Sequence, residues 1–193
     1  MERRVCNEFL GEAMTPAERQ RIAAYLDETR ENLLRVTRNL SPSQLQYKSA
    51  PDRWSVAECL EHLTMVENTV LGNIQNAVKE AAGSPTPAMS DQDLVRTVID
   101  RSFRATAPER IEPTGKTPQD RLLAEFEAAR RRTSEFVAST SAPLRQYAFA
   151  HPRFGQCDCY QWLLLAASHG ERHRQQIEEV IAGAGFPRAA AAS

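Results

Sequence analysis

The 193-residue sequence lacks several features that define specialised protein classes. It has no excess of one charge: 24 basic against 25 acidic side chains leave a formal net charge of −1. That balance excludes the positive field that gathers nucleic acid or anionic lipid. The longest strictly apolar run, residues 162–167, is far below the ~20 residues that a membrane-spanning helix needs. The chain is therefore expected to bind neither nucleic acid nor a membrane.

Cysteine is sparse, and no pair has the C-x-x-C spacing of a zinc ribbon or redox motif. The start, Met1–Arg4, is followed by no apolar stretch, so neither a secretory nor a twin-arginine signal is expected. Without a secretory context a disulfide framework is not expected either. The prediction is a cytoplasmic protein with free thiols at Cys6, Cys59, Cys157 and Cys159.

Runs of alternating β-branched residues are also missing, so essentially no sheet is expected. Four amphipathic segments are present instead, each opened by a helix-capping signal. Capping boxes at Thr15 and at Ser55 predict helices over 16–40 and 55–82. Thr117, followed by proline, and Asp158 predict helices over 118–141 and 159–183.

The first of these helices has a single narrow apolar stripe, as helices of a bundle do. Short connectors join the first two and the last two helices, while a long proline-rich crossover, residues 83–116, joins the second to the third. Ser90 caps a short helix within that crossover. This pattern predicts an all-α fold, a four-helix bundle with a long crossover between helices 2 and 3. The whole chain, 1–193, is expected to form one domain, with an N-terminal arm at 1–14 and a loose tail at 188–193.

Three histidines are predicted to face the interior of this bundle. His169 and His173 lie one turn apart on the fourth helix, so their Cβ atoms are roughly 5–6 Å apart and both rings can reach one ion. An H-x-x-x-H pair is common by chance, and two part-buried histidines that hydrogen-bond to neighbours are the plain alternative. His62 faces inward from the second helix, where it shares a face with Cys59 and Val66.

These segments together resemble the DinB-like superfamily of metal-binding bundles. The second helix carries WSVAECLEHL at 54–63, and the last connector and helix carry HPRFG at 151–155, QWL at 161–163 and HGERHRQQI at 169–177. The resemblance implies an up-down-down-up bundle and a homodimer. It also implies a metal held by His62, His169 and His173. Family activities include proposed metal-dependent hydrolysis and transfer reactions that use low-molecular-weight thiols.

Three neutral imidazoles leave part of a divalent ion open, whereas a closed structural site uses four protein ligands. Such an ion lowers the pKa of a bound water from 15.7 to about 7, which suits a hydrolase acting on a small-molecule substrate. A low-molecular-weight thiol bound as thiolate would instead suit an S-transferase. A non-catalytic metal- or small-molecule-binding sensor is the third reading. Nickel or zinc is expected first, while iron or manganese also accepts three imidazoles.

A hydrolase also benefits from a general acid or base near the ion. Glu58 is expected to use its carboxylate in the helix cap, and Glu171 is expected to face solvent. Neither is therefore predicted to assist. That absence favours a thiol, or a substrate that supplies its own reacting group.

Each of the remaining polar residues near these motifs has two possible roles. Arg172 and Gln176 could contact substrate or support the ligands; the alternatives are a salt bridge to the first helix and an interhelical hydrogen bond. His151 is expected to hold its turn rather than bind the ion, and Cys59 to be a small core residue. The basic run 130–132 is expected to lie on a solvated helix face.

Overall fold

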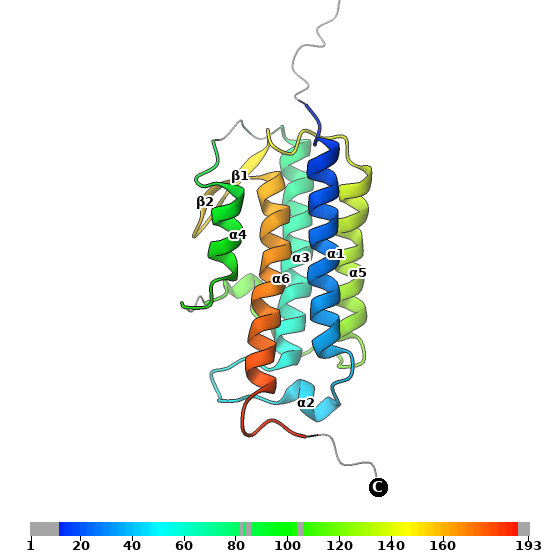
Figure 1. The fold of residues 1–193 in the computed structure, drawn as a ribbon, viewed down its shortest axis with the longest axis vertical. Helices are drawn as coiled ribbons and strands as arrows, with labels where there is room; N and C mark the ends of the chain where they lie inside the picture. The colour runs from blue at the N-terminus through cyan, green and yellow to red at the C-terminus, as the bar shows by residue number, and fades with distance from the viewer. Residues whose placement is uncertain (1–11, 82, 84–85, 104–105, 189–193) are drawn as a thin grey trace, which may run out of the picture.

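The computed structural model describes residues 12–81, 83, 86–103 and 106–188. Four long helices dominate it: α1 (Pro16–Thr37), α3 (Val56–Lys79), α5 (Leu122–Ser139) and α6 (Cys159–Ile181). Helices α1 and α6 run in one direction and α3 and α5 in the other (Figure 1). The predicted up-down-down-up four-helix bundle is confirmed.

The helices form a square in which α6 and α5 each pack against both α1 and α3. Their inward stripes build the core. Two clusters of buried side chains fill it, one beneath the end of the bundle where α6 begins and one nearer its other end. Their largest fully buried apolar members are Tyr160, Phe126, Ile22, Leu26, Leu33, Leu60, Leu63, Ile74, Leu94, Leu122 and Leu144.

Side-chain caps begin three of the four long helices as the sequence predicts. Thr15 and Glu18 form a reciprocal capping box at α1, and Ser55 and Glu58 form another at α3. At α6 the Asp158 carboxylate accepts a hydrogen bond from the backbone N–H of Gln161 at 2.7 Å. Each bond satisfies a donor that the first helical turn leaves unpaired.

Replacing Ser55 with alanine should therefore lower the free energy of unfolding by about 1 kcal/mol. Ser55 is buried, and its Oγ accepts from the Glu58 N–H at 3.2 Å, so water cannot fully replace the lost acceptor. Urea denaturation measures the change. The control is Ser139→Ala at the exposed end of α5, which should stay within about 0.5 kcal/mol of the parent. Equal effects of the two substitutions would contradict the assignment of the cap.

The third long helix starts later than predicted. It begins at Leu122 rather than 118, after Arg121, which provides no side-chain cap. Thr117, the predicted cap, donates its hydroxyl to Glu61 of α3 instead. Thr117 is suited to capping a helix, but here it links the crossover to α3. The local sequence does not encode this long-range contact.

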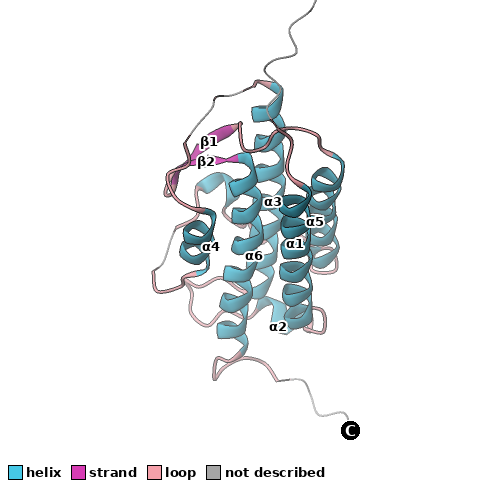
Figure 2. Cartoon of the chain, turned by 45° about the horizontal axis from the view of Figure 1, so that its top comes forward, coloured by secondary structure: helices cyan, strands magenta, loops and turns pink. Residues whose placement is uncertain are grey.

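Several short elements were not predicted. Ser41 caps a five-residue helix, α2 (Pro42–Gln46), in the first connector. The last connector forms an antiparallel hairpin of β1 (Ala148–His151) and β2 (Gly155–Asp158), so the expectation of essentially no sheet is wrong here (Figure 2). Gly155 permits the turn because its φ of +70° suits glycine. The strands have only four residues each, too few for a recognisable alternation.

The crossover between α3 and α5 contains the predicted short helix, α4 (Asp91–Ile99), which Ser90 caps. Helix α4 packs against α6 on the outside of the bundle (Figure 1). A single 3-10 turn, η1 (Glu109–Ile111), follows and contacts α3. The crossover therefore covers the side of the bundle on which α3 and α6 meet.

Arg130 corrects the prediction for the basic run 130–132. Its side chain is 1% exposed and forms an ion pair with the equally buried Glu67 of α3, with Nη2 and Oε1 2.6 Å apart. Arg131 and Arg132 are exposed, as expected. The run thus places one charge inside the bundle because α5 turns that position toward α3 and α1.

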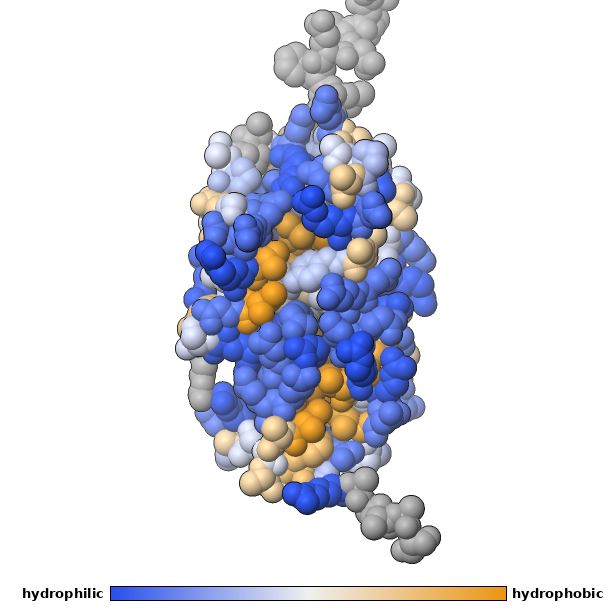
Figure 3. Space-filling view, in the orientation of Figure 1, coloured by the Kyte–Doolittle hydropathy of each residue, from blue (hydrophilic) through white to orange (hydrophobic). Residues whose placement is uncertain are grey.

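Parts of four predicted segments lie outside the described residues: positions 1–11 of the arm, 82 of the predicted second helix, 84–85 and 104–105 of the crossover, and 189–193 of the tail. Within the described part, every helix is too short or too polar to cross a membrane. The surface in Figure 3 is mostly hydrophilic, with apolar side chains exposed in separate strips.

Candidate metal centre

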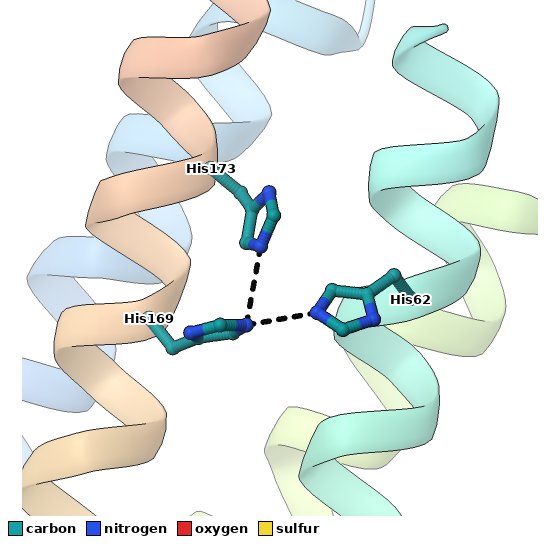
Figure 4. A group of neighbouring side chains, drawn as sticks. All are labelled: His62, His169 and His173. Carbon is teal, nitrogen blue, oxygen red and sulfur yellow. Dashed lines mark hydrogen bonds between the residues drawn. The ribbon is translucent and has the colours of Figure 1, made fainter. Parts of the chain in front are cut away.

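Three histidine rings meet between α3 and α6. His62 extends from α3, and His169 and His173 extend from successive turns of α6 (Figure 4). The Nε2 of His169 lies 2.9 Å from that of His62 and 3.1 Å from that of His173. Their ligand atoms all fall within 4.8 Å of one another. The structure therefore brings together the three side chains that the sequence singled out.

The orientation of His62 is set by a backbone carbonyl. Its Nδ1 lies 2.7 Å from the carbonyl oxygen of Ile111 in η1, so Nδ1 carries the proton and donates it. Nε2 of His62 is then left with a lone pair aimed at the other two rings. Metal-binding histidines commonly have such a hydrogen bond on their second ring nitrogen.

The donor set fits a divalent ion. His169 Nε2 could donate one proton to either neighbour, but it cannot satisfy both the His62 and His173 lone pairs in good geometry. An ion would accept all three lone pairs. Nitrogen ligands at 2.0–2.1 Å from a tetrahedral ion are about 3.3 Å apart, and the separations of 2.9 and 3.1 Å from His169 to the other two rings are within a few tenths of an ångström of that spacing. The buried Nδ1 of His173 has no hydrogen-bond partner within the described chain.

Burial keeps these rings neutral, which is the form that binds metal. His62 and His173 are buried, and His169 retains a partly exposed surface. Desolvation lowers the pKa of His62 below its usual value of 6.5. The pKa of His169 is lowered well below 6.5, first by desolvation and then by the neighbouring His62. The pKa of His173 is also lowered well below 6.5, first by desolvation and then by His169. The cluster is therefore a set of free bases at neutral pH.

These shifts predict how the metal-free protein responds to acid. Because the folded-state pKa values lie below 6.5, the unfolded chain binds more protons as the pH falls, and stability is lost from about pH 6.5 downward. The urea midpoint of chelator-treated protein should be lower at about pH 5 than at about pH 7.5. This difference should be smaller in His169→Gln. A midpoint that is the same at both pH values would contradict this account of the site.

Trp54 forms a wall of the centre that the sequence did not indicate. Its ring stacks on His173, with centroids 5.8 Å apart and planes 16° apart, and it lies 4.8 Å from the centroid of His62. The residue precedes the Ser55 cap, where an apolar residue is usually a packing staple. Nothing in the local pattern distinguishes that role from contact with the histidines.

Arg172 does not form the predicted salt bridge to the first helix, and the hydrogen bond of Gln176 is to the crossover rather than to another helix. Arg172 donates to backbone carbonyls of the crossover, including that of Phe103 at 2.8 Å, and not to a carboxylate of α1. Gln176 accepts at 3.3 Å from Arg101, which follows α4 and pairs with Glu179. Both residues thus connect α6 to the crossover.

Other candidate residues lie outside the cluster. His151 holds its turn as predicted, since Nδ1 accepts from the N–H groups of Arg153 and Phe154 at 3.1 and 3.3 Å. Cys59 is buried in the core, where desolvation raises its thiol pKa to about 12. Glu58 serves the helix cap. Glu171 is part-buried and pairs with Arg174, so the prediction that it faces solvent is wrong.

The structure is a four-helix bundle in which three histidine rings lie close enough together to hold one ion. A family model described as the DinB superfamily matches residues 25–177. The protein belongs to that superfamily. The family resemblance read from the sequence is therefore confirmed.

Individual relatives are distant. YuaE of Bacillus subtilis, described as uncharacterized, is 24% identical over 155 residues, which span 80% of this chain and 93% of YuaE. The solved structure of YfiT from Bacillus subtilis, described as a probable metal-dependent hydrolase with an unusual four-helix bundle topology, matches with a TM-score of 0.63 at 15% identity. That match covers 92% of this chain and 93% of YfiT. The four-helix bundle protein TT2238 matches with a TM-score of 0.53 at 21% identity, covering 83% and 98% of the two chains.

Proposed function

We propose that this protein is a metal-dependent hydrolase in which His62, His169 and His173 bind one divalent ion. The observation that carries the proposal is the convergence of three Nε2 atoms from two helices. The superfamily membership and the description of YfiT support it. Zinc or nickel fits three imidazoles, and so does iron or manganese.

The cluster has no fourth protein ligand among the described residues, which leaves one side of an ion for substrate or water. An ion held this way supplies Lewis acidity and a bound water with a pKa near 7. The chain supplies the rest. Trp54 and the surrounding core exclude bulk water from one side, and the Ile111 carbonyl keeps the proton of His62 on Nδ1.

One observation favours a second candidate, a thiol S-transferase. No carboxylate in the described part of the chain joins the cluster, so no acidic side chain is in place as a general base. A low-molecular-weight thiol would need less help, because a divalent ion held by the three histidines would favour its thiolate form without a carboxylate as general base. A small-molecule substrate and a homodimer are part of this proposal, as expected for the superfamily.

The test is turnover of metal-loaded protein on a panel of esters, amides and pairs of a thiol with an electrophile. We expect hydrolysis that falls to background in His62→Ala. The control His151→Ala removes a histidine outside the cluster and should retain the activity. Transfer from thiols without hydrolysis would favour the S-transferase. Metal binding without turnover of either kind would leave a sensor or binding protein and reject the hydrolase.

A further inference from the structure

Two charged side chains next to the histidines are buried without a partner of opposite charge in the described part of the chain. Glu61 precedes His62 on α3 and is 8% exposed, while Arg172 precedes His173 on α6 and is 9% exposed. Burying a charge is costly unless hydrogen bonds satisfy it. Both side chains form their hydrogen bonds with the crossover, the segment that connects α3 to α5.

Glu61 accepts from the far end of the crossover. Its Oε1 accepts from the hydroxyl of Thr114 at 2.8 Å and from that of Thr117 at 3.2 Å, and its Oε2 accepts from the N–H of Gly115 at 2.8 Å. Gly115 has a φ of +68°, a left-handed conformation that favours glycine. The backbone is therefore shaped so that its N–H meets this carboxylate.

Arg172 donates to the near end of the crossover. Its guanidinium bonds to the carbonyl oxygens of Val98, Asp100 and Phe103, the last at 2.8 Å. It also lies 4.8 Å from the centre of the Phe103 ring. The planar fork of arginine suits several acceptors at once, which a lysine would not match.

Between these two anchors lies Ile111, whose carbonyl holds the proton of His62. The 3-10 turn that presents this carbonyl has no fully buried residue, and only the part-buried side chain of Ile111 packs against the core. The polar contacts at either side also hold the turn in place. Glu61 of α3 and Arg172 of α6 thus hold the two ends of the crossover segment that contains Ile111, and the Ile111 carbonyl orients His62. We call this pair of anchors the clamp.

We propose that Glu61 and Arg172 are positioning residues that fix the tautomer and orientation of His62 through the Ile111 carbonyl. This inference rests on the proposed metal centre, but its first consequence is visible without metal. When the clamp is intact, His62 keeps its proton on Nδ1 and directs the Nε2 lone pair inward. When either anchor is lost, the carbonyl moves and the His62 proton is shared between both ring nitrogens.

The experiment compares Glu61→Gln and Arg172→Met with the parent protein. Matched controls are Glu135→Gln and Arg131→Met, which remove one charge each from exposed side chains of α5. Long-range proton–nitrogen NMR of the imidazoles in chelator-treated protein reports the His62 tautomer. Hydrogen exchange at the amides of Glu112 and Gly115 reports whether the crossover stays seated, and zinc competition titration reports affinity.

In both anchor variants we expect a mixed His62 tautomer, faster exchange at those amides and zinc affinity reduced by about 10–100-fold. Helicity should stay unchanged, and Arg172→Lys should give an intermediate result. Thr117→Val removes one of the weaker hydrogen bonds to Glu61. This variant can be measured in place of Glu61→Gln if the Glu61→Gln protein does not fold. It should shift the tautomer in the same direction.

The inference is overturned if both anchor variants keep the Nδ1–H tautomer and zinc affinity within twofold of the parent. A lower melting temperature with an unchanged tautomer would show a purely structural role and also reject it. Failure of the proposed function has a different signature. The parent protein would then bind no metal, or would bind it and turn over no substrate, while the tautomer measurements on metal-free protein would still decide the role of Glu61 and Arg172.

Discussion

Replacing Arg130 with methionine should lower the free energy of unfolding by about 3–5 kcal/mol, because it leaves the buried carboxylate of Glu67 without a counter-ion. The same change removes hydrogen bonds from the guanidinium to the Leu26 carbonyl at 2.9 Å and the Thr29 hydroxyl at 2.8 Å. The pair thus ties α5 to α3 and α1. Urea denaturation followed by circular dichroism measures the loss.

Arg131→Met is the matched control, since that side chain is 67% exposed one position along the same helix. It should change stability by no more than about 0.5 kcal/mol. The double variant Arg130→Met with Glu67→Leu should recover much of the loss, because a buried ion pair replaced whole by apolar residues is often neutral. A loss below about 1 kcal/mol in Arg130→Met would show that water reaches this position.

A divalent metal should stabilise the folded protein strongly. An ion that binds only the folded state adds about 2.7 kcal/mol at a free concentration of one hundred times its Kd. We expect zinc to raise the Tm of chelator-treated protein and His169→Ala to abolish the increase, since His169 contacts both other rings. Thermal melts with and without zinc measure both.

His151→Ala is the control for this experiment. It removes a histidine that holds the hairpin turn and lies outside the cluster, so the increase in Tm with zinc should survive. An equal increase in His169→Ala and in the parent protein would place the binding elsewhere. No increase in the parent would argue against a resident divalent ion.

The long helices could be predicted because their signals are local. Capping boxes at Thr15 and Ser55 lie within four residues of the helices they begin, and the apolar stripes repeat along each helix. The hairpin was missed because its four-residue strands carry no clear alternation. The late start of α5 was missed because Thr117 bonds to Glu61, 56 residues away in sequence.

The three histidines could be singled out because helical spacing and the family resemblance pointed to the same positions. What surrounds them could not. The partner of His62 is the backbone carbonyl of Ile111, which leaves no trace in residue type. The burial of Arg130 depends on Glu67, 63 residues earlier on another helix. Contacts of this kind follow from how segments pack, and a single helix face does not encode them.

The three-histidine metal centre can be tested by elemental analysis of untagged protein that has been dialysed against zinc or nickel and then freed of loosely bound metal. We expect about one ion per chain in the parent, and close to none in His62→Ala, His169→Ala and His173→Ala. Circular dichroism should show the same helicity in all four, because caps and core packing hold the helices. A parent protein without metal, or alanine variants that retain the full amount, would contradict the three-histidine centre.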